Sequence, residues 1–131
     1  MYIKNIPLVF RGSILPKIIS MKIGLIGATG PAGKALAARL SSVGYEVTIG
    51  SRSKYRALEI RDEIVSAWPE KELKITAAEN IDAAKADLIV IATPWDAAAT
   101  AARSVAEHLH GKIVIWINRS CLVIQISNVS I

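Results

Sequence analysis

The chain has 131 residues, of which 52% are hydrophobic, 21% charged and 5% aromatic. This length and composition fit a single globular domain, and they exclude a disordered chain, a collagen-like repeat and a coiled coil. The net charge is +5, but residues 21–117 hold 12 basic and 11 acidic side chains, so most of the basic excess lies outside them. No basic patch large enough to bind nucleic acid is therefore expected.

Between residues 21 and 117, short apolar runs alternate with segments in which apolar residues recur at helical spacing. In chain order, these patterns predict strands over 22–27, 46–50, 73–76, 87–92 and 112–117, and helices over 31–43, 53–68 and 95–109. Strands that alternate with helices indicate βαβ units and a parallel sheet. The predicted fold class is α/β, as a Rossmann-type, mostly parallel five-stranded sheet with helices on both faces.

The first predicted strand leads into its helix through the sequence GATGPAG. Gly27 permits a tight turn, Gly30 lets the backbone approach a pyrophosphate, and Gly33 allows close packing of helix on strand. Pro31 suits a first helical turn, and the Thr29 hydroxyl can donate to a phosphate oxygen. This turn therefore predicts a phosphate site at a helix N-terminus. A turn that needs glycines only for its own shape is the alternative.

The end of the second predicted strand favours one nicotinamide cofactor over the other. A domain selective for NAD usually places an acidic residue about 20 residues past the glycines, but residues 47–58 contain none. Ser51 and Arg52 stand at the strand end, and Arg56 follows one helical turn later. A hydroxyl and guanidinium groups suit a 2′-phosphate, so the cofactor is predicted to be NADP(H). The alternative is a solvated basic start to the helix.

A third candidate segment follows the fourth predicted strand. Ligands of open α/β sheets lie outside the carboxyl ends of the strands. Pro94 stiffens this loop, Trp95 offers a broad face to a ribose or nicotinamide, and Ala99 leaves room one turn later. The alternative for Trp95 is an aromatic residue of the core or an interface, and Asp96 is interpreted as a charge at a helix start.

Cysteine and histidine usage excludes several kinds of site. The single cysteine, Cys121, excludes a disulfide framework and fits a reducing compartment, so a cytoplasmic location is expected. His108 and His110 have no cysteine or carboxylate pair at ligand spacing, and no metal site is expected.

The two ends differ in composition from residues 21–117. Residues 1–20 are expected to be an N-terminal extension, either a surface arm or the product of a start codon assigned too early, with Met21 as the natural first residue. Residues 118–131 are expected to be an atypical apolar tail. A membrane span is not expected there, because Arg119 would lie near the centre of the apolar stretch 113–131.

Three segments of the chain resemble the NADPH-dependent reductases of coenzyme F420: MKIGLIGATGPAGKALAARL, TIGSRSKYRA and DLIVIATPWDAA. The resemblance covers the nucleotide-binding domain, residues 21–117. It implies that the cofactor-binding residues are Thr29, Gly30, Pro31 and Ala32 at the pyrophosphate, Ser51, Arg52 and Arg56 at the 2′-phosphate, and Trp95 and Ala99 along the nucleotide.

The resemblance also implies an oxidoreductase that transfers a hydride between NADP(H) and coenzyme F420, with a homodimer as the expected assembly. The hydride passes directly between two stacked rings, so no catalytic side chain is expected. The family's C-terminal domain has no counterpart after residue 117, and the chain is expected to be truncated. Two alternatives stay open: a non-catalytic nucleotide-binding remnant, and the N-terminal domain of another NADP-dependent reductase of the pyrroline-carboxylate or imine type.

Overall fold

The computed structural model describes residues 21–117 and 122–125. The sequence predictions for residues 1–20, and for 118–121 and 126–131 of the tail, lie outside the described residues. The described elements are β1 (Lys22–Ile26), α3 (Pro31–Ser42), β2 (Glu46–Ser51), α4 (Lys54–Ala67), β3 (Ile75–Glu79), α5 (Asn80–Ala83), β4 (Leu88–Ile91), α6 (Trp95–Ser104), the 3-10 helix η2 (Ala106–His108), β5 (Ile113–Trp116) and β6 (Leu122–Gln125).

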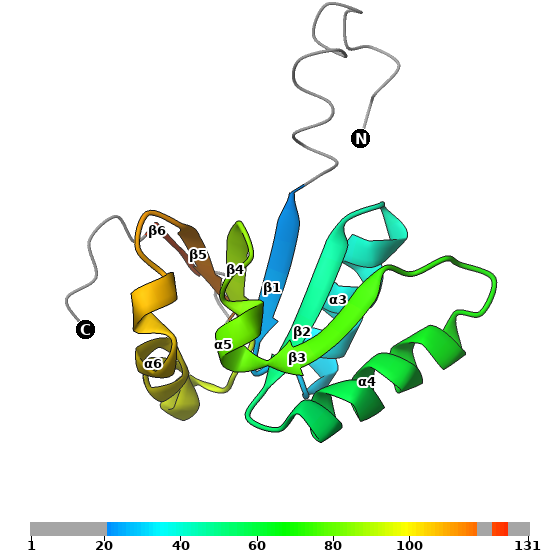
Figure 1. The fold of residues 1–131 in the computed structure, drawn as a ribbon, viewed down its shortest axis with the longest axis horizontal. Coiled ribbons are helices and arrows are strands. Elements are labelled where there is room, and N and C mark those ends of the chain that lie inside the picture. The colour runs from blue at the N-terminus through cyan, green and yellow to red at the C-terminus, as the bar shows by residue number, and fades with distance from the viewer. Residues whose placement is uncertain (1–20, 118–121, 126–131) are drawn as a thin grey trace, which may run out of the picture.

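The strands form one sheet in the order β3-β2-β1-β4-β5-β6. Strands β1 to β5 are parallel, and β6 runs antiparallel to β5 with Trp116 opposite Leu122. The chain builds the sheet outward from β1 on one side and then crosses over to place β4 on the other. In Figure 1 the loops that lead into α3, α4 and α6 all lie along the lower edge of the sheet. Because of this crossover from one side of β1 to the other, the direction in which successive strands are added reverses between β1 and β4.

The predicted fold class is confirmed, and all five predicted strands are present. The prediction did not include β6, which adds an antiparallel edge strand, as many α/β sheets have. Strand β3 begins and ends later than predicted, because pairing with β2 from Val47–Ile75 to Ser51–Glu79 carries its alanine-rich end into the sheet. The predicted helix over 95–109 is divided, because α6 ends at Ser104 and the next residue, Val105, has a φ of −123°, which is not helical.

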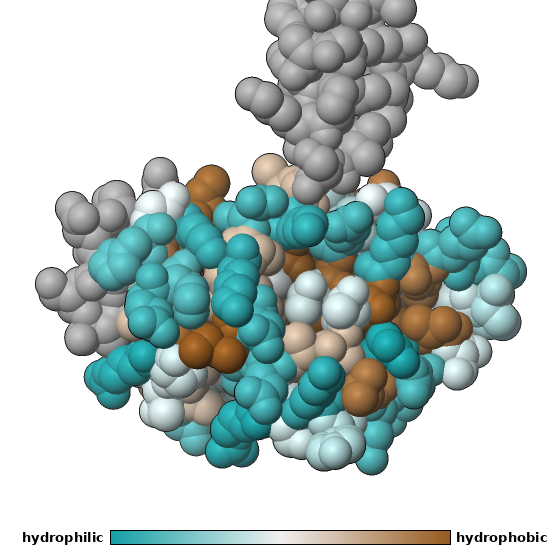
Figure 2. Space-filling model, in the orientation of Figure 1, coloured by the Kyte–Doolittle hydropathy of each residue, from teal (hydrophilic) through white to brown (hydrophobic). Residues whose placement is uncertain are grey.

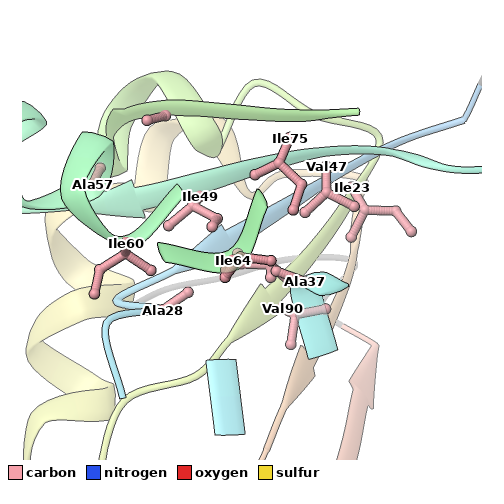
Figure 3. Packing of buried hydrophobic residues seen from close by; sticks show 12 residues of the cluster. Ile23, Ala28, Ala37, Val47, Ile49, Ala57, Ile60, Ile64, Ile75 and Val90 are labelled. Carbon is pink, nitrogen blue, oxygen red and sulfur yellow. The ribbon is translucent and has the colours of Figure 1, made fainter. Parts of the chain in front are cut away.

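One face of the sheet is covered by α3 and α4. Alternate residues of β1, Ile23 and Leu25, point to this face, as the two-residue period of a strand requires. Figure 3 shows Ile23 with other apolar side chains of this cluster, between the sheet and the helices. The cluster consists of Ile23, Leu25, Ala28, Ala37, Val47, Ile49, Ala57, Ile60, Ile64, Ile75, Ala77 and Val90.

The opposite face is covered by α5 and α6. Its core gathers Ile26, Ala83, Ala84, Ala86, Ile89, Ile91, Ala98, Val105, Leu109 and Val114. A Cβ on Gly24 would overlap the carbonyl oxygen of Ala83, so α5 lies directly on β1. The short α5 was not predicted, because four residues are too few for a periodic pattern. With helices on both faces, the parallel strands are buried on both sides, which explains their continuous apolar sequences.

The surface shown in Figure 2 is mostly hydrophilic, with smaller apolar areas among the polar side chains. Within residues 21–117 and 122–125, no helix is both long and apolar enough to cross a membrane.

Candidate functional site

The candidate site lies along one edge of the sheet, where parallel strands end and helices begin. Strands β1, β2 and β4 lead there into α3, α4 and α6, and Figure 1 shows these three helix starts on the same side of the molecule. Ligands of open α/β sheets bind outside the carboxyl ends of the strands, at the point where the strand order reverses. In this sheet that point lies between the ends of β1 and β4.

Two glycines of the turn after β1 are required by the protein's own packing. Gly27 has a φ of +66°, which favours glycine, and a Cβ at this position would overlap the methyl group of Thr93. A Cβ on Gly33 would lie 2.7 Å from the Cα of Ala28, so this glycine brings α3 close to the turn. The tight turn and the close helix packing predicted from the sequence are both confirmed.

Gly30 differs from the other two glycines of the turn. Its φ is −88°, which any residue can adopt, and a Cβ at this position would meet no atom within 4 Å. Nothing in the described structure therefore requires a glycine here. A glycine that faces open space is explained if a molecule outside the chain approaches the backbone closely.

The N-terminus of α3 is open to an anion. Gly30 is the N-cap, no side chain caps the helix, and its first turn contains no acidic residue. The first amide that forms a helical hydrogen bond is that of Lys34, which donates to the Gly30 carbonyl at 3.0 Å. In the described part of the chain, the N–H groups of Ala32 and Gly33 find no acceptor. Free N–H groups and the positive end of the helix dipole together favour phosphate.

The end of β2 lies beside this turn. The Ala28 amide donates to the Gly50 carbonyl at 3.2 Å. This hydrogen bond joins the glycine turn to the residue that directly precedes Ser51. Ser51 is 7% exposed, and its hydroxyl accepts a 3.4 Å hydrogen bond from the Ser53 amide. Arg52 is exposed, and no hydrogen bond or ion pair engages its guanidinium group in residues 21–117.

Arg56 occupies the first turn of α4 and has a partner. Its guanidinium group lies 3.0 Å from Glu59, and both side chains are exposed. The first turn of α4 contains no acidic residue, and no side chain caps it. Cations at a helix N-terminus oppose the helix dipole, each by about 0.3–1 kcal/mol. A bound anion at this position would offset that cost.

The segment after β4 approaches the turn from the other side. Trp95 begins α6, and Ala99 follows one turn later with an exposed side chain. Trp95 and Ala99 therefore belong to a helix that begins at the same edge of the sheet as the glycine turn.

Two residues at this edge were not assigned to the site from sequence. Asn80, the first residue of α5 after β3, accepts a 3.1 Å hydrogen bond from the Gly27 amide with its side-chain oxygen. Thr93 packs its methyl group against Gly27, while its hydroxyl oxygen is buried without a hydrogen-bond partner. The position of Asn80 could not be found, because β3 was predicted to end at residue 76. Thr93 lay in the predicted loop, but its sequence pattern carried no signal beyond that placement.

A groove of about 520 Å³ lies elsewhere, between α3 and α4, and shares only Pro31 with the residues predicted to bind the cofactor. Lys34 and Glu63 form an ion pair there at 2.6 Å, joining the two helices. Hydrogen bonding to Lys34, together with its positive charge, lowers the pKa of the Glu63 carboxyl group. No cluster of three or more potential metal ligands occurs in the residues that the structure describes.

Comparison with known proteins identifies relatives over the same residues. A family model described as NADP oxidoreductase, coenzyme F420-dependent, matches residues 22–119. The F420-dependent NADP reductase of Methanothermobacter marburgensis is 35% identical over 96 residues, which are 72% of this chain and 43% of that protein. The F420-dependent NADP reductase of Methanocaldococcus jannaschii is 35% identical over 100 residues, which are 74% of this chain and 44% of that protein.

A solved structure also matches. It is a crystal structure assigned as an F420-dependent NADP reductase from Arthrobacter sp. FB24, with a TM-score of 0.62 and 35% sequence identity. The match covers 75% of this chain and 44% of that chain, so this chain spans less than half the length of each of these relatives. The family model and the identities over about three quarters of the chain agree, and the chain belongs to the coenzyme F420-dependent NADP oxidoreductase family.

Proposed function

We propose that residues 21–117 form an NADP(H)-binding domain, and that the chain serves hydride transfer between NADP(H) and coenzyme F420. One observation carries the proposal: at the carboxyl edge of the sheet, an uncapped helix and a glycine facing open space adjoin an unpaired arginine. Membership of the family favours coenzyme F420 over the hydride acceptors of pyrroline-carboxylate or imine reductases.

The pyrophosphate of the cofactor would lie at the N-terminus of α3. Gly30 provides the space for its close approach, and the Ala32 amide is free to donate to a phosphate oxygen. Thr29 would add its hydroxyl group, and Pro31 suits the first helical residue, because an N–H at that position would have no partner within the helix. This arrangement supports a phosphate site, rather than a turn that needs glycines only for its own shape.

The 2′-phosphate would lie between the end of β2 and the start of α4. Arg52 is exposed and available for a charge-assisted contact, and the Ser51 hydroxyl lies one residue before it. Arg56 would turn from Glu59 to the phosphate, at the cost of an exposed ion pair. The absence of acidic residues from 47 to 58 supports NADP(H) over NAD(H).

Trp95 and Ala99 would line the nicotinamide half of the site from α6. When bound, the nicotinamide supplies the hydride chemistry, and the protein contributes binding and orientation. We therefore assign no acid or base to the chain.

The proposal also includes a cytoplasmic location and a homodimeric assembly. A cytoplasmic location is supported by the single cysteine, Cys121, which suits a reducing compartment. A homodimer is proposed from the resemblance to the family. Sedimentation velocity of the purified chain tests the dimer, and a single species with the monomer mass would refute it.

Titration of the purified chain with NADPH and with NADH tests the proposal. We expect NADPH to bind at least ten times more tightly, because only NADPH carries a phosphate for Arg52. Equal affinities would refute the cofactor assignment. In a second assay, NADPH and oxidised F420 are mixed with the protein, and the F420 absorbance is followed. Hydride transfer needs the two rings held within about 3–3.5 Å, and this nucleotide-binding domain supplies one side of that pair, so we expect NADPH binding with little or no change in the F420 absorbance. Turnover at an ordinary enzymatic rate, about 1–1000 per second, would show that these residues or a dimer of them complete the site.

A further inference from the structure

Thr93 contains a buried polar atom that the protein does not satisfy. The residue follows β4 directly, and its hydroxyl oxygen is shielded from solvent without a hydrogen-bond partner in the described structure. Buried hydroxyl groups in native proteins nearly always have a partner, so an exception calls for a physical explanation. A ligand that supplies the missing partner is one such explanation.

The position of Thr93 indicates which ligand this is. Its methyl group occupies the space that a Cβ on Gly27 would need, so the side chain lies against the first residue of the glycine turn. The Ala92 amide donates to the Ile26 carbonyl at 2.9 Å, which keeps β4 beside β1 up to this point. Thr93 therefore stands where the strand order reverses, and a dinucleotide crosses the sheet edge at that place.

We propose that Thr93 is a nucleotide-binding residue, whose hydroxyl group donates a hydrogen bond to a phosphate oxygen of the bound dinucleotide. This inference rests on the proposed function, since it assumes that a dinucleotide binds at this edge. The hydroxyl oxygen is covered in the free protein, so the side chain must rotate about χ1 for the contact to form. A rotation of about 120° places the hydroxyl group where the methyl group now lies, against Gly27, and moves the methyl group to the third staggered position.

Replacement of Thr93 by valine tests the hydroxyl group on its own. Thr93→Val keeps the branched shape and the methyl contact with Gly27, and it removes the unsatisfied oxygen. We expect the affinity for NADPH to fall about tenfold, the loss typical of one hydrogen bond to a charged group. The thermal unfolding midpoint without nucleotide should not fall. Thr100→Val is the matched control, because Thr100 is exposed on α6, and its affinity should equal that of the parent.

A second pair of variants keeps the test decisive if Thr93→Val does not fold. Thr93→Ser and Thr93→Ala both lose the methyl group and differ only in the hydroxyl. We expect the serine variant to bind NADPH about tenfold more tightly than the alanine variant. Equal affinities in both comparisons, in a chain that still prefers NADPH to NADH, would overturn the role of Thr93 and leave the proposed function standing. A parent chain that binds neither cofactor would overturn both.

Discussion

Replacement of Arg52 by alanine should remove most of the preference for NADPH. Arg52 is exposed, and residues 21–117 provide it with no ion pair or hydrogen bond, so it can meet a phosphate without breaking another contact. Loss of one contact to a charged group costs about 1.5–3 kcal/mol, which corresponds to roughly a 10- to 150-fold weaker affinity for NADPH. The affinity for NADH should stay nearly unchanged, because NADH has no 2′-phosphate.

Arg56 should contribute less than Arg52, because its guanidinium group is already paired with Glu59 at 3.0 Å. Exposed pairs of this kind contribute about 0.2–1 kcal/mol, and the phosphate must compete with that interaction. Glu59→Gln should therefore free Arg56 and raise the affinity for NADPH by up to about fivefold, without an effect on NADH.

Fluorescence titration of the reduced cofactors measures both effects at one ionic strength. Lys54→Ala is the control for Arg52→Ala, because it removes the same charge two residues later, at a position not assigned to the cofactor. If Lys54→Ala reduces NADPH binding as much as Arg52→Ala, general attraction to a basic helix start explains the preference. The assignment of Arg52 to the 2′-phosphate would then be wrong.

Three further predictions follow from the glycine turn and the groove. Gly30→Ala should leave the thermal unfolding midpoint nearly unchanged and weaken NADPH binding, because the added Cβ meets only open space in the free protein. Gly33→Ala should destabilise the fold by about 1–3 kcal/mol in denaturant unfolding, because its Cβ would lie 2.7 Å from Ala28; an unchanged midpoint would contradict this packing. An NMR titration should find the Glu63 pKa below that of an ordinary glutamate, and Lys34→Ala should return it upward. The ion pair is therefore present above the ordinary glutamate pKa and is lost as the pH falls through the lowered one.

The sequence predicted the strands that are buried on both faces, because a strand in that environment needs a continuous apolar sequence. Residues 88–91, LIVI, are such a strand, and they form β4 within the predicted range. The pattern failed where pairing with a neighbouring strand decides the structure. The last three residues of β3, Ala77, Ala78 and Glu79, have low strand propensity, and they are held in the sheet by β2.

The site was predictable to the extent that it depends on backbone conformation and charge. The glycine turn has a fixed spacing, and the acid-free end of β2 is visible in the sequence, so both could be proposed without a structure. Asn80 and Thr93 could not be found in the same way. Asn80 is 53 residues from Gly27 in sequence, and only the sheet order brings its side chain to the Gly27 amide.

The three glycines of the turn separate the requirements of folding from those of binding. Gly27 and Gly33 are enclosed by protein atoms, so a side chain at either position disturbs the fold whether or not a cofactor is bound. A Cβ on Gly30 would meet no protein atom within 4 Å. A glycine at this position therefore costs backbone entropy on folding without any packing gain in the free protein. That cost is offset only in a complex, where the absence of a Cβ lets a phosphate reach the first amides of α3. The same reasoning applies to the unpaired Thr93 hydroxyl group, since a buried group without a partner is unfavourable until a ligand supplies one.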